Sequence, residues 1–135
     1  MGKIGPIKAR KILVIDDDKN ITVVIARYLA RLGFEPICAL NGRNGLKLAK
    51  RKKPDMIILD IIMPGLDGYQ VLEKLKKNEH TMHIPVLILT AKIELDDRIK
   101  ASQHYSEEYI SKPFDLYELK EKIEAVFSRR DILTS

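Results

Sequence analysis

The sequence predicts an α/β fold: a five-stranded, doubly wound parallel sheet in the order 2-1-3-4-5, with helices on both faces. Short apolar runs, typical of strands buried on both faces, alternate along the chain with segments of helical periodicity. The 135 residues and 45% hydrophobic content fit one domain with a real core. We therefore expect one (βα)5 domain.

The first two strand–helix units occupy the amino-terminal third of the chain. Residues 12–15 are apolar throughout and end at three consecutive aspartates, which predicts the first strand. Residues 20–32 have apolar side chains at helical spacing, and Gly33 follows them as a helix terminator. Residues 34–39 predict a weaker second strand, and residues 44–52 predict the second helix.

Three more units follow. Strands are predicted at residues 56–59, 85–89 and 109–110, and helices at about residues 69–76, 97–103 and 116–127. The last helix is strongly amphipathic, because Leu116, Leu119 and Ile123 fall on one side. We divide the chain into a flexible basic lead-in (1–10), one domain (11–130) and a C-terminal tail or start of a linker (131–135).

The net charge of +5 is concentrated in two basic runs, residues 1–11 and 43–53. We interpret them as a flexible arm and a solvated helix face. Attraction to an acidic partner or to phosphate is the alternative. Because aromatic residues do not interleave with these cations and no nucleic-acid motif is present, direct DNA binding by this segment is not expected.

Apolar runs and cysteine usage limit the cellular setting. No run approaches the roughly 18 apolar residues of a membrane span, and no signal peptide opens the chain, so we expect a cytoplasmic protein without a membrane partner. The single cysteine, Cys38, cannot form an internal disulfide, and we expect it to be a small buried side chain in the second strand.

Polar residues stand where four of the predicted strands end. Asp16 and Asp17 follow the first strand, Asp60 the third, Thr90 the fourth and Lys112 the fifth. In the order 2-1-3-4-5 the first and third strands are neighbours, so these three carboxylates would share one crevice and would need a cation or a proton. Oxygen ligands favour Mg²⁺ or a similar hard ion.

The same set predicts phosphoryl chemistry. Lys112 offers a positive charge and Thr90 a hydroxyl donor to phosphoryl oxygens, and Asp60 lies centrally, where it would be the nucleophile. Asp18 is better explained as the cap of the following helix.

Four segments resemble the receiver domain of two-component response regulators. They are Val14–Asp18, Leu59–Gly68, Leu89–Ala91 and Tyr109–Phe114, within a resemblance that runs from about residue 11 to 130. The resemblance implies a flavodoxin-like fold and a phosphoacceptor that assists its own phosphotransfer and dephosphorylation rather than a turnover enzyme.

The resemblance also implies roles for single residues. Asp60 would receive phosphate from a sensor histidine kinase. Asp17 and Asp60 would bind Mg²⁺ (or Mn²⁺) by side chain, Ile62 by its backbone carbonyl, and Asp16 through water. The residues implied as the switch pair are Thr90 and Tyr109, and Lys112 would precede a cis Lys-Pro bond.

For signalling, the resemblance implies an output face made by the fourth helix, fifth strand and fifth helix. In the winged-helix class, which residues 112–130 resemble, charged pairs cross a phosphorylation-dependent homodimer; here they would be Arg98 with Glu118, and Glu108 with Lys122. A free-standing receiver and a piece of a regulator with a missing C-terminal output domain both remain open, as do the kinase, the signal, the output and the phosphoryl lifetime.

Two other functions stay as alternatives. An aspartyl-phosphate phosphohydrolase of the haloacid-dehalogenase type needs a second aspartate two residues after the nucleophile, where this chain has Ile62. A phosphate-independent pseudo-receiver, acting only as an interaction module, is disfavoured because every expected site residue is present.

Overall fold

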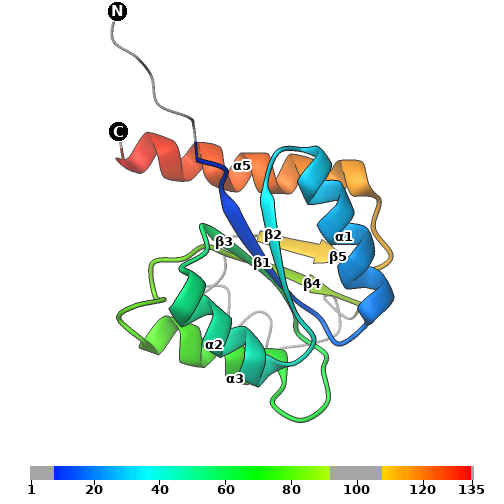
Figure 1. Cartoon of the computed structure of the whole chain (residues 1–135), viewed down its shortest axis with the longest axis vertical. Helices are drawn as coiled ribbons and strands as arrows, with labels where there is room; N and C mark the ends of the chain where they lie inside the picture. Colours follow the sequence, from blue (N-terminus) through cyan, green and yellow to red (C-terminus); the bar gives the residue numbers. More distant parts are fainter. Residues whose placement is uncertain (1–7, 92–107, 135) are drawn as a thin grey trace, which may run out of the picture.

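In the computed structural model, which describes residues 8–91 and 108–134, five parallel strands form one sheet in the order β2-β1-β3-β4-β5 (Figure 1). The strands are β1 (Lys11–Ile15), β2 (Glu35–Ala39), β3 (Met56–Asp60), β4 (Val86–Thr90) and β5 (Glu108–Ser111). Strand order, parallel pairing and flavodoxin-like topology are confirmed. The central strands are the apolar runs identified in the sequence.

Helices cover both faces of the sheet (Figure 1). They are α1 (Lys19–Arg31), α2 (Gly42–Lys52), α3 (Gly68–Lys77) and α5 (Leu116–Thr134). The helix expected at about 97–103 lies outside the described residues. None of the described helices combines the length and the apolar character that crossing a membrane requires.

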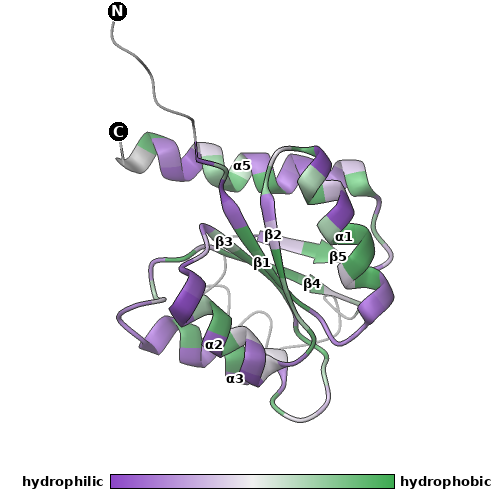
Figure 2. Cartoon of the chain, viewed as in Figure 1, coloured by the Kyte–Doolittle hydropathy of each residue, from purple (hydrophilic) through white to green (hydrophobic). Residues whose placement is uncertain are grey.

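Side-chain alternation along the strands builds two core layers. Leu13 and Ile15 of β1 face the layer shared with α2 and α3, whereas Ile12 and Val14 face the layer shared with α1 and α5. All four of these side chains are buried. Figure 2 shows the central strands as mostly hydrophobic, apart from the start of β1, and the helices as mixed. A strand covered on both faces needs this continuous apolar run.

Short polar side chains begin the helices. Asp18 caps α1 by accepting from the backbone N–H groups of Asn20 at 2.9 Å and Ile21 at 3.4 Å, as expected. Asp67 and Gln70 form a reciprocal capping box at the start of α3. These caps fix where the chain turns from the carboxyl end of a strand into the next helix.

Two sequence expectations are wrong. Helix α5 continues through Thr134 instead of ending at Phe127. The polar residues after Phe127 lose the apolar period but contain no helix breaker. Cys38 is exposed rather than buried, and it lies on β2, an edge strand of the sheet.

Candidate functional site

The carboxyl ends of four strands bring the expected polar residues to one edge of the sheet. Asp60 ends β3 and Thr90 ends β4, while Asp16 directly follows β1. The register pairs Ile15 with Leu59, and Asp60 with Leu89, so the ends of β1, β3 and β4 lie side by side. The strand order therefore assembles residues from distant parts of the chain.

Three carboxylates form a tight cluster at this edge. One oxygen each from Asp16, Asp17 and Asp60 lie within 4.8 Å of one another. Asp16 is 0% exposed and Asp60 5%, whereas Asp17 is exposed. Oxygen donors gathered at this spacing, with one side open to solvent, fit a hard divalent cation.

Lys112 supplies the positive charge that the cluster needs within the protein. Its Nζ donates to Asp16 Oδ2 at 2.9 Å and to Asp60 Oδ2 at 3.2 Å. Burial works against its charge, but hydrogen bonds and attraction from Asp16 and Asp60 outweigh that effect and raise the Lys112 pKa. Lys112 therefore stays protonated between the two carboxylates.

The surroundings of Asp60 have opposing effects on its pKa. Burial, with a smaller contribution from the charge of Asp16, raises the Asp60 pKa to about 6, against the lowering effects of the Ile62 N–H and of Lys112. That N–H donates to Asp60 Oδ1 at 3.0 Å. The resemblance implied a role for the Ile62 carbonyl; the N–H contact, which it did not imply, fixes the orientation of the Asp60 carboxyl group.

Asp16 and Asp18 have different positions despite their proximity in sequence. Asp16 Oδ1 accepts from the Asp18 backbone N–H at 2.9 Å, and its other oxygen holds Lys112. The Asp18 side chain turns to the start of α1. Asp16 therefore anchors both the acidic loop and the lysine, a direct role that was not expected from the sequence.

Thr90 and Tyr109 lie on the neighbouring strands β4 and β5. Thr90 is fully buried, and its carbonyl accepts from the Lys112 backbone N–H at 2.8 Å. Tyr109 is half-buried and packs against the core layer that contains Ile88, its register partner. The Lys112–Pro113 bond is cis, as expected.

Gly68 brings the loop after β3 back against the site. Its N–H donates to the Ile61 carbonyl at 2.9 Å. A Cβ at this position would collide with the backbone of Asp60 and Ile61. Glycine at the start of α3 was the available sequence signal, but the close approach that it permits required the structure.

On the β5–α5 side, Glu108 pairs within the chain. Lys122 Nζ lies 3.0 Å from Glu108 Oε1, and Arg129 lies 3.7 Å from its other oxygen. The resemblance implied Glu108 with Lys122 as a pair between two copies; in the structure of one chain they already contact each other. Arg98, implied as the partner of Glu118, lies outside the described residues.

A doubly wound parallel sheet with buried aspartates and a lysine at its carboxyl edge defines a class of signalling domain. The chain belongs to the response regulator receiver domain family, whose profile matches residues 12–124. It is therefore a receiver domain of two-component signalling.

Among curated proteins, the chain is 36% identical over 123 residues to the alkaline phosphatase synthesis transcriptional regulatory protein PhoP of Bacillus subtilis, covering 91% of this chain and 50% of that protein. The chain thus spans about half the length of this relative. It is 35% identical over 118 residues to protein PilH of Pseudomonas aeruginosa, covering 87% of this chain and 98% of PilH.

Solved structures of receiver domains are also similar to this chain. The N-terminal domain of a response regulator receiver protein from Methanoculleus marisnigri is 39% identical, with a TM-score of 0.74, covering 88% of this chain and 97% of that one. The receiver domain of a sensor histidine kinase from Pseudomonas aeruginosa, with magnesium coordinated in its active-site cleft, is 29% identical, with a TM-score of 0.77, covering 84% of this chain and 93% of that one.

Proposed function

We propose that this receiver domain accepts a phosphoryl group on Asp60 from a sensor histidine kinase and uses Mg²⁺ to do so. The observation that carries the proposal is the position of Asp60, which is buried beside Asp16 and Asp17 and contacts Lys112. A nucleophile, an acidic cluster and a fixed cation are the parts that phosphoryl transfer to a carboxylate needs.

In the proposed transfer, a carboxylate oxygen of Asp60 forms a bond to phosphorus while the bond from phosphorus to the kinase histidine nitrogen breaks. The electron pair of that bond leaves with the imidazole. Lys112 holds positive charge beside the reacting oxygens, and the Ile62 N–H keeps the Asp60 carboxyl group oriented. The Thr90 hydroxyl would donate to a phosphoryl oxygen.

Asp17 and Asp60 would bind Mg²⁺ by side chain, the Ile62 carbonyl would add a ligand, and Asp16 would act through water. The clustered carboxylate oxygens support this set. When bound, the ion supplies charge neutralisation between the carboxylates and the phosphoryl oxygens. The magnesium in the cleft of the related kinase receiver also supports this choice.

Thr90 and Tyr109 form the proposed switch. Movement of Thr90 toward the phosphoryl group would open space into which the half-buried Tyr109 turns, shifting a population between two packings. The output face would include β5 and α5, where a phosphorylation-dependent homodimer forms or an output domain is controlled. Such a dimer would have to exchange the Glu108–Lys122 pair seen within one chain.

The test is intact-mass analysis after incubation with acetyl phosphate and Mg²⁺. We expect one added phosphoryl group on the wild-type chain, and none on Asp60→Asn or in excess chelator. Asp18→Asn, which keeps a helix cap outside the site, is the matched control and should be modified normally. An adduct that persists in Asp60→Asn would overturn the assignment of Asp60.

A further inference from the structure

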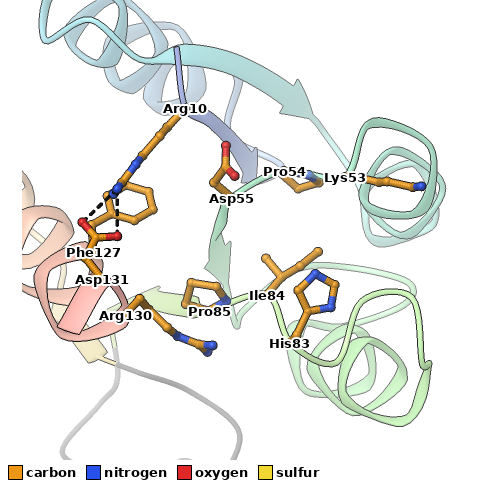
Figure 3. Close-up of a pocket in the computed structure, with 10 residues that line it drawn as sticks. All are labelled: Arg10, Lys53, Pro54, Asp55, His83, Ile84, Pro85, Phe127, Arg130 and Asp131. Atoms are coloured by element: carbon orange, nitrogen blue, oxygen red, sulfur yellow. Dashed lines mark hydrogen bonds and ion pairs between the residues drawn. The ribbon is translucent and has the colours of Figure 1, made fainter. Parts of the chain in front are cut away.

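A second charged region lies at the opposite edge of the sheet, where the strands begin. A pocket of about 320 Å³ is lined there by residues next to the starts of β1, β3 and β4 and by the end of α5 (Figure 3). A neighbouring hollow of about 490 Å³ shares Arg10, Lys53 and Asp55 with it. The two hollows therefore form one continuous surface.

Cations dominate this surface, which we call the basic edge. Its cationic side chains around the start of β1 and the end of α2 are Lys8, Arg10, Lys11, Arg51, Lys52 and Lys53. Arg130 of α5 adds a seventh, while the carboxylates that line either hollow, among the residues the structure describes, are Asp55 and Asp131. Segments that are far apart in the sequence thus place one sign of charge together.

A local explanation accounts for only part of this cluster. Basic residues in the last turn of α2 compensate the partial negative charge at the carboxyl end of a helix, which explains Arg51 and Lys52. It does not explain why Lys8 and Arg10 from the lead-in, or Arg130 from α5, meet them at the same edge.

Specific contacts hold the basic edge in shape. The Arg10 guanidinium lies 4.3 Å from the centroid of the Phe127 ring and donates to both Asp131 oxygens at 2.9 Å (Figure 3). Lys11 Nζ donates to the Lys52 carbonyl at 3.4 Å, which ties the start of β1 to the end of α2. Arg10 and Lys11 are therefore held by contacts with α5 and α2 rather than carried on a loose arm.

The floor of the pocket restricts what can bind. Ile84 is 2% exposed and Phe127 7%, and Pro54 and Pro85 are buried. A partner would therefore find little apolar surface for an anchoring side chain, and recognition would depend on charge. An acidic peptide held by charge alone would have to order its flexible side chains, an entropic cost that a duplex avoids.

We propose that the basic edge binds the phosphate backbone of nucleic acid without reading its bases. Duplex DNA presents a negative charge about every 1.7 Å, and neutralising its phosphates releases counterions. Two adjoining cationic hollows match such a repeating polyanion. From the sequence, DNA binding was not expected because aromatic residues do not interleave with the cations and no nucleic-acid motif is present. Contact with backbone phosphates alone needs neither, and the convergence of the two basic runs at one edge reverses that expectation. The proposal is independent of phosphorylation at Asp60, which lies at the other end of β3.

The test is fluorescence anisotropy of the whole chain with a labelled duplex of about 20 base pairs, from about 50 to about 200 mM NaCl. Lys8→Glu combined with Lys52→Glu should weaken binding at least about tenfold and reduce the salt slope by about two. The matched control reverses Arg27 of α1 and Lys74 of α3, which are also exposed, giving the same net charge. It should change affinity less than about threefold, since only long-range attraction is altered.

Competition identifies the class of partner. We expect poly-L-glutamate and phosphatidylglycerol vesicles to bind more weakly than the duplex at equal charge concentration, and duplexes of unrelated sequence to bind equally. Circular dichroism of both double variants confirms that they fold, and Lys8→Gln with Lys52→Gln should give an intermediate loss. Equal effects of the two charge reversals, stronger binding to polyglutamate or vesicles, or no duplex binding at low salt would overturn the proposal.

Discussion

At the carboxyl edge of the sheet, the side chain of Lys112 is 18% exposed and that of its partner Asp16 is 1% exposed. At the amino edge, the side chain of Arg10 is 40% exposed and that of its partner Asp131 is 59% exposed. The first pair is buried in low dielectric, where charges interact strongly. The second is screened by water and salt. The same sheet thus holds one charge cluster suited to chemistry and another suited to long-range attraction.

Burial also changes how strongly a charged residue indicates a functional site. Exposed lysines at the end of a helix are common and alone do not indicate a binding surface. The basic edge is notable because three segments of the chain converge there. A buried aspartate is rare unless it is paired. Asp16 and Asp60 together with a single lysine therefore indicate a functional site even before any comparison with relatives.

The largest effect should come from removing the buried cation. Lys112→Met leaves Asp16 and Asp60 without their partner, and we expect the free energy of unfolding to fall by about 3 kcal/mol in metal-free buffer at neutral pH. Lys122→Met, which breaks the more exposed pair with Glu108, should cost less than about 1 kcal/mol. Urea unfolding measures both. Equal losses would mean that the buried pairs of Lys112 and the more exposed pair of Lys122 do not differ in dielectric environment.

The second prediction uses the raised pKa of Asp60. Because its pKa is about 6 in the folded chain, above its ordinary value, the folded state binds more protons between about pH 4 and 6, and Asp60 favours folding as the pH falls through this window. At pH 7.5 the ionised group is therefore destabilising. Asp60→Asn should stabilise the metal-free chain there by about 2 kcal/mol, with the gain vanishing near pH 4.

Urea unfolding at several pH values in chelator checks this second prediction. Asp115→Asn is the matched control, because Asp115 is exposed and its role is to accept from the Glu118 N–H at 2.7 Å, which asparagine can also do. That control should not stabilise the chain at pH 7.5. A gain of equal size in both variants would contradict the assignment to burial.

The third prediction concerns the metal site. Asp17→Asn should weaken Mg²⁺ binding at least about tenfold because it removes a carboxylate from the cluster. Asp18→Asn should change it less than about threefold, since Asp18 caps α1 and asparagine caps equally well. A metal titration compares the two variants. Similar losses would mean that Asp18 also faces the ion.

Much of the fold could be predicted because its strands are buried on both faces. The runs that became β1 and β3 are continuous, and each is bounded by an aspartate, so their ends and their adjacency followed from the parallel-sheet rule. Burial failed as a prediction for Cys38, because an apolar segment alone does not distinguish an edge strand from a central one.

The residues at the carboxyl edge of the sheet could be predicted to lie together, whereas those at the basic edge could not. The carboxylates at the carboxyl edge of the sheet end strands or directly follow them, so the strand order predicted that they lie together. The basic edge depends on Arg130 and Asp131 at the end of α5, a helix whose last turns carry no apolar period. The hydrogen bonds of Lys112 to Asp16 and of the Ile62 N–H to Asp60 depend on distances that spacing in sequence does not encode.

The smallest effect should come from the contacts that fix Arg10. Arg10→Met removes both the ion pair with Asp131 and the stacking on Phe127, and we expect a loss of about 1 kcal/mol in the free energy of unfolding. Asp131→Asn removes the ion pair alone. At about 50 mM NaCl it should reproduce roughly half of that loss, and at about 500 mM almost none, because salt screens exposed pairs. Urea unfolding at the two salt concentrations separates the contributions. If Arg10→Met loses its whole effect in high salt, the contact with Phe127 contributes nothing to stability, and the shape of the basic edge depends on the ion pair alone.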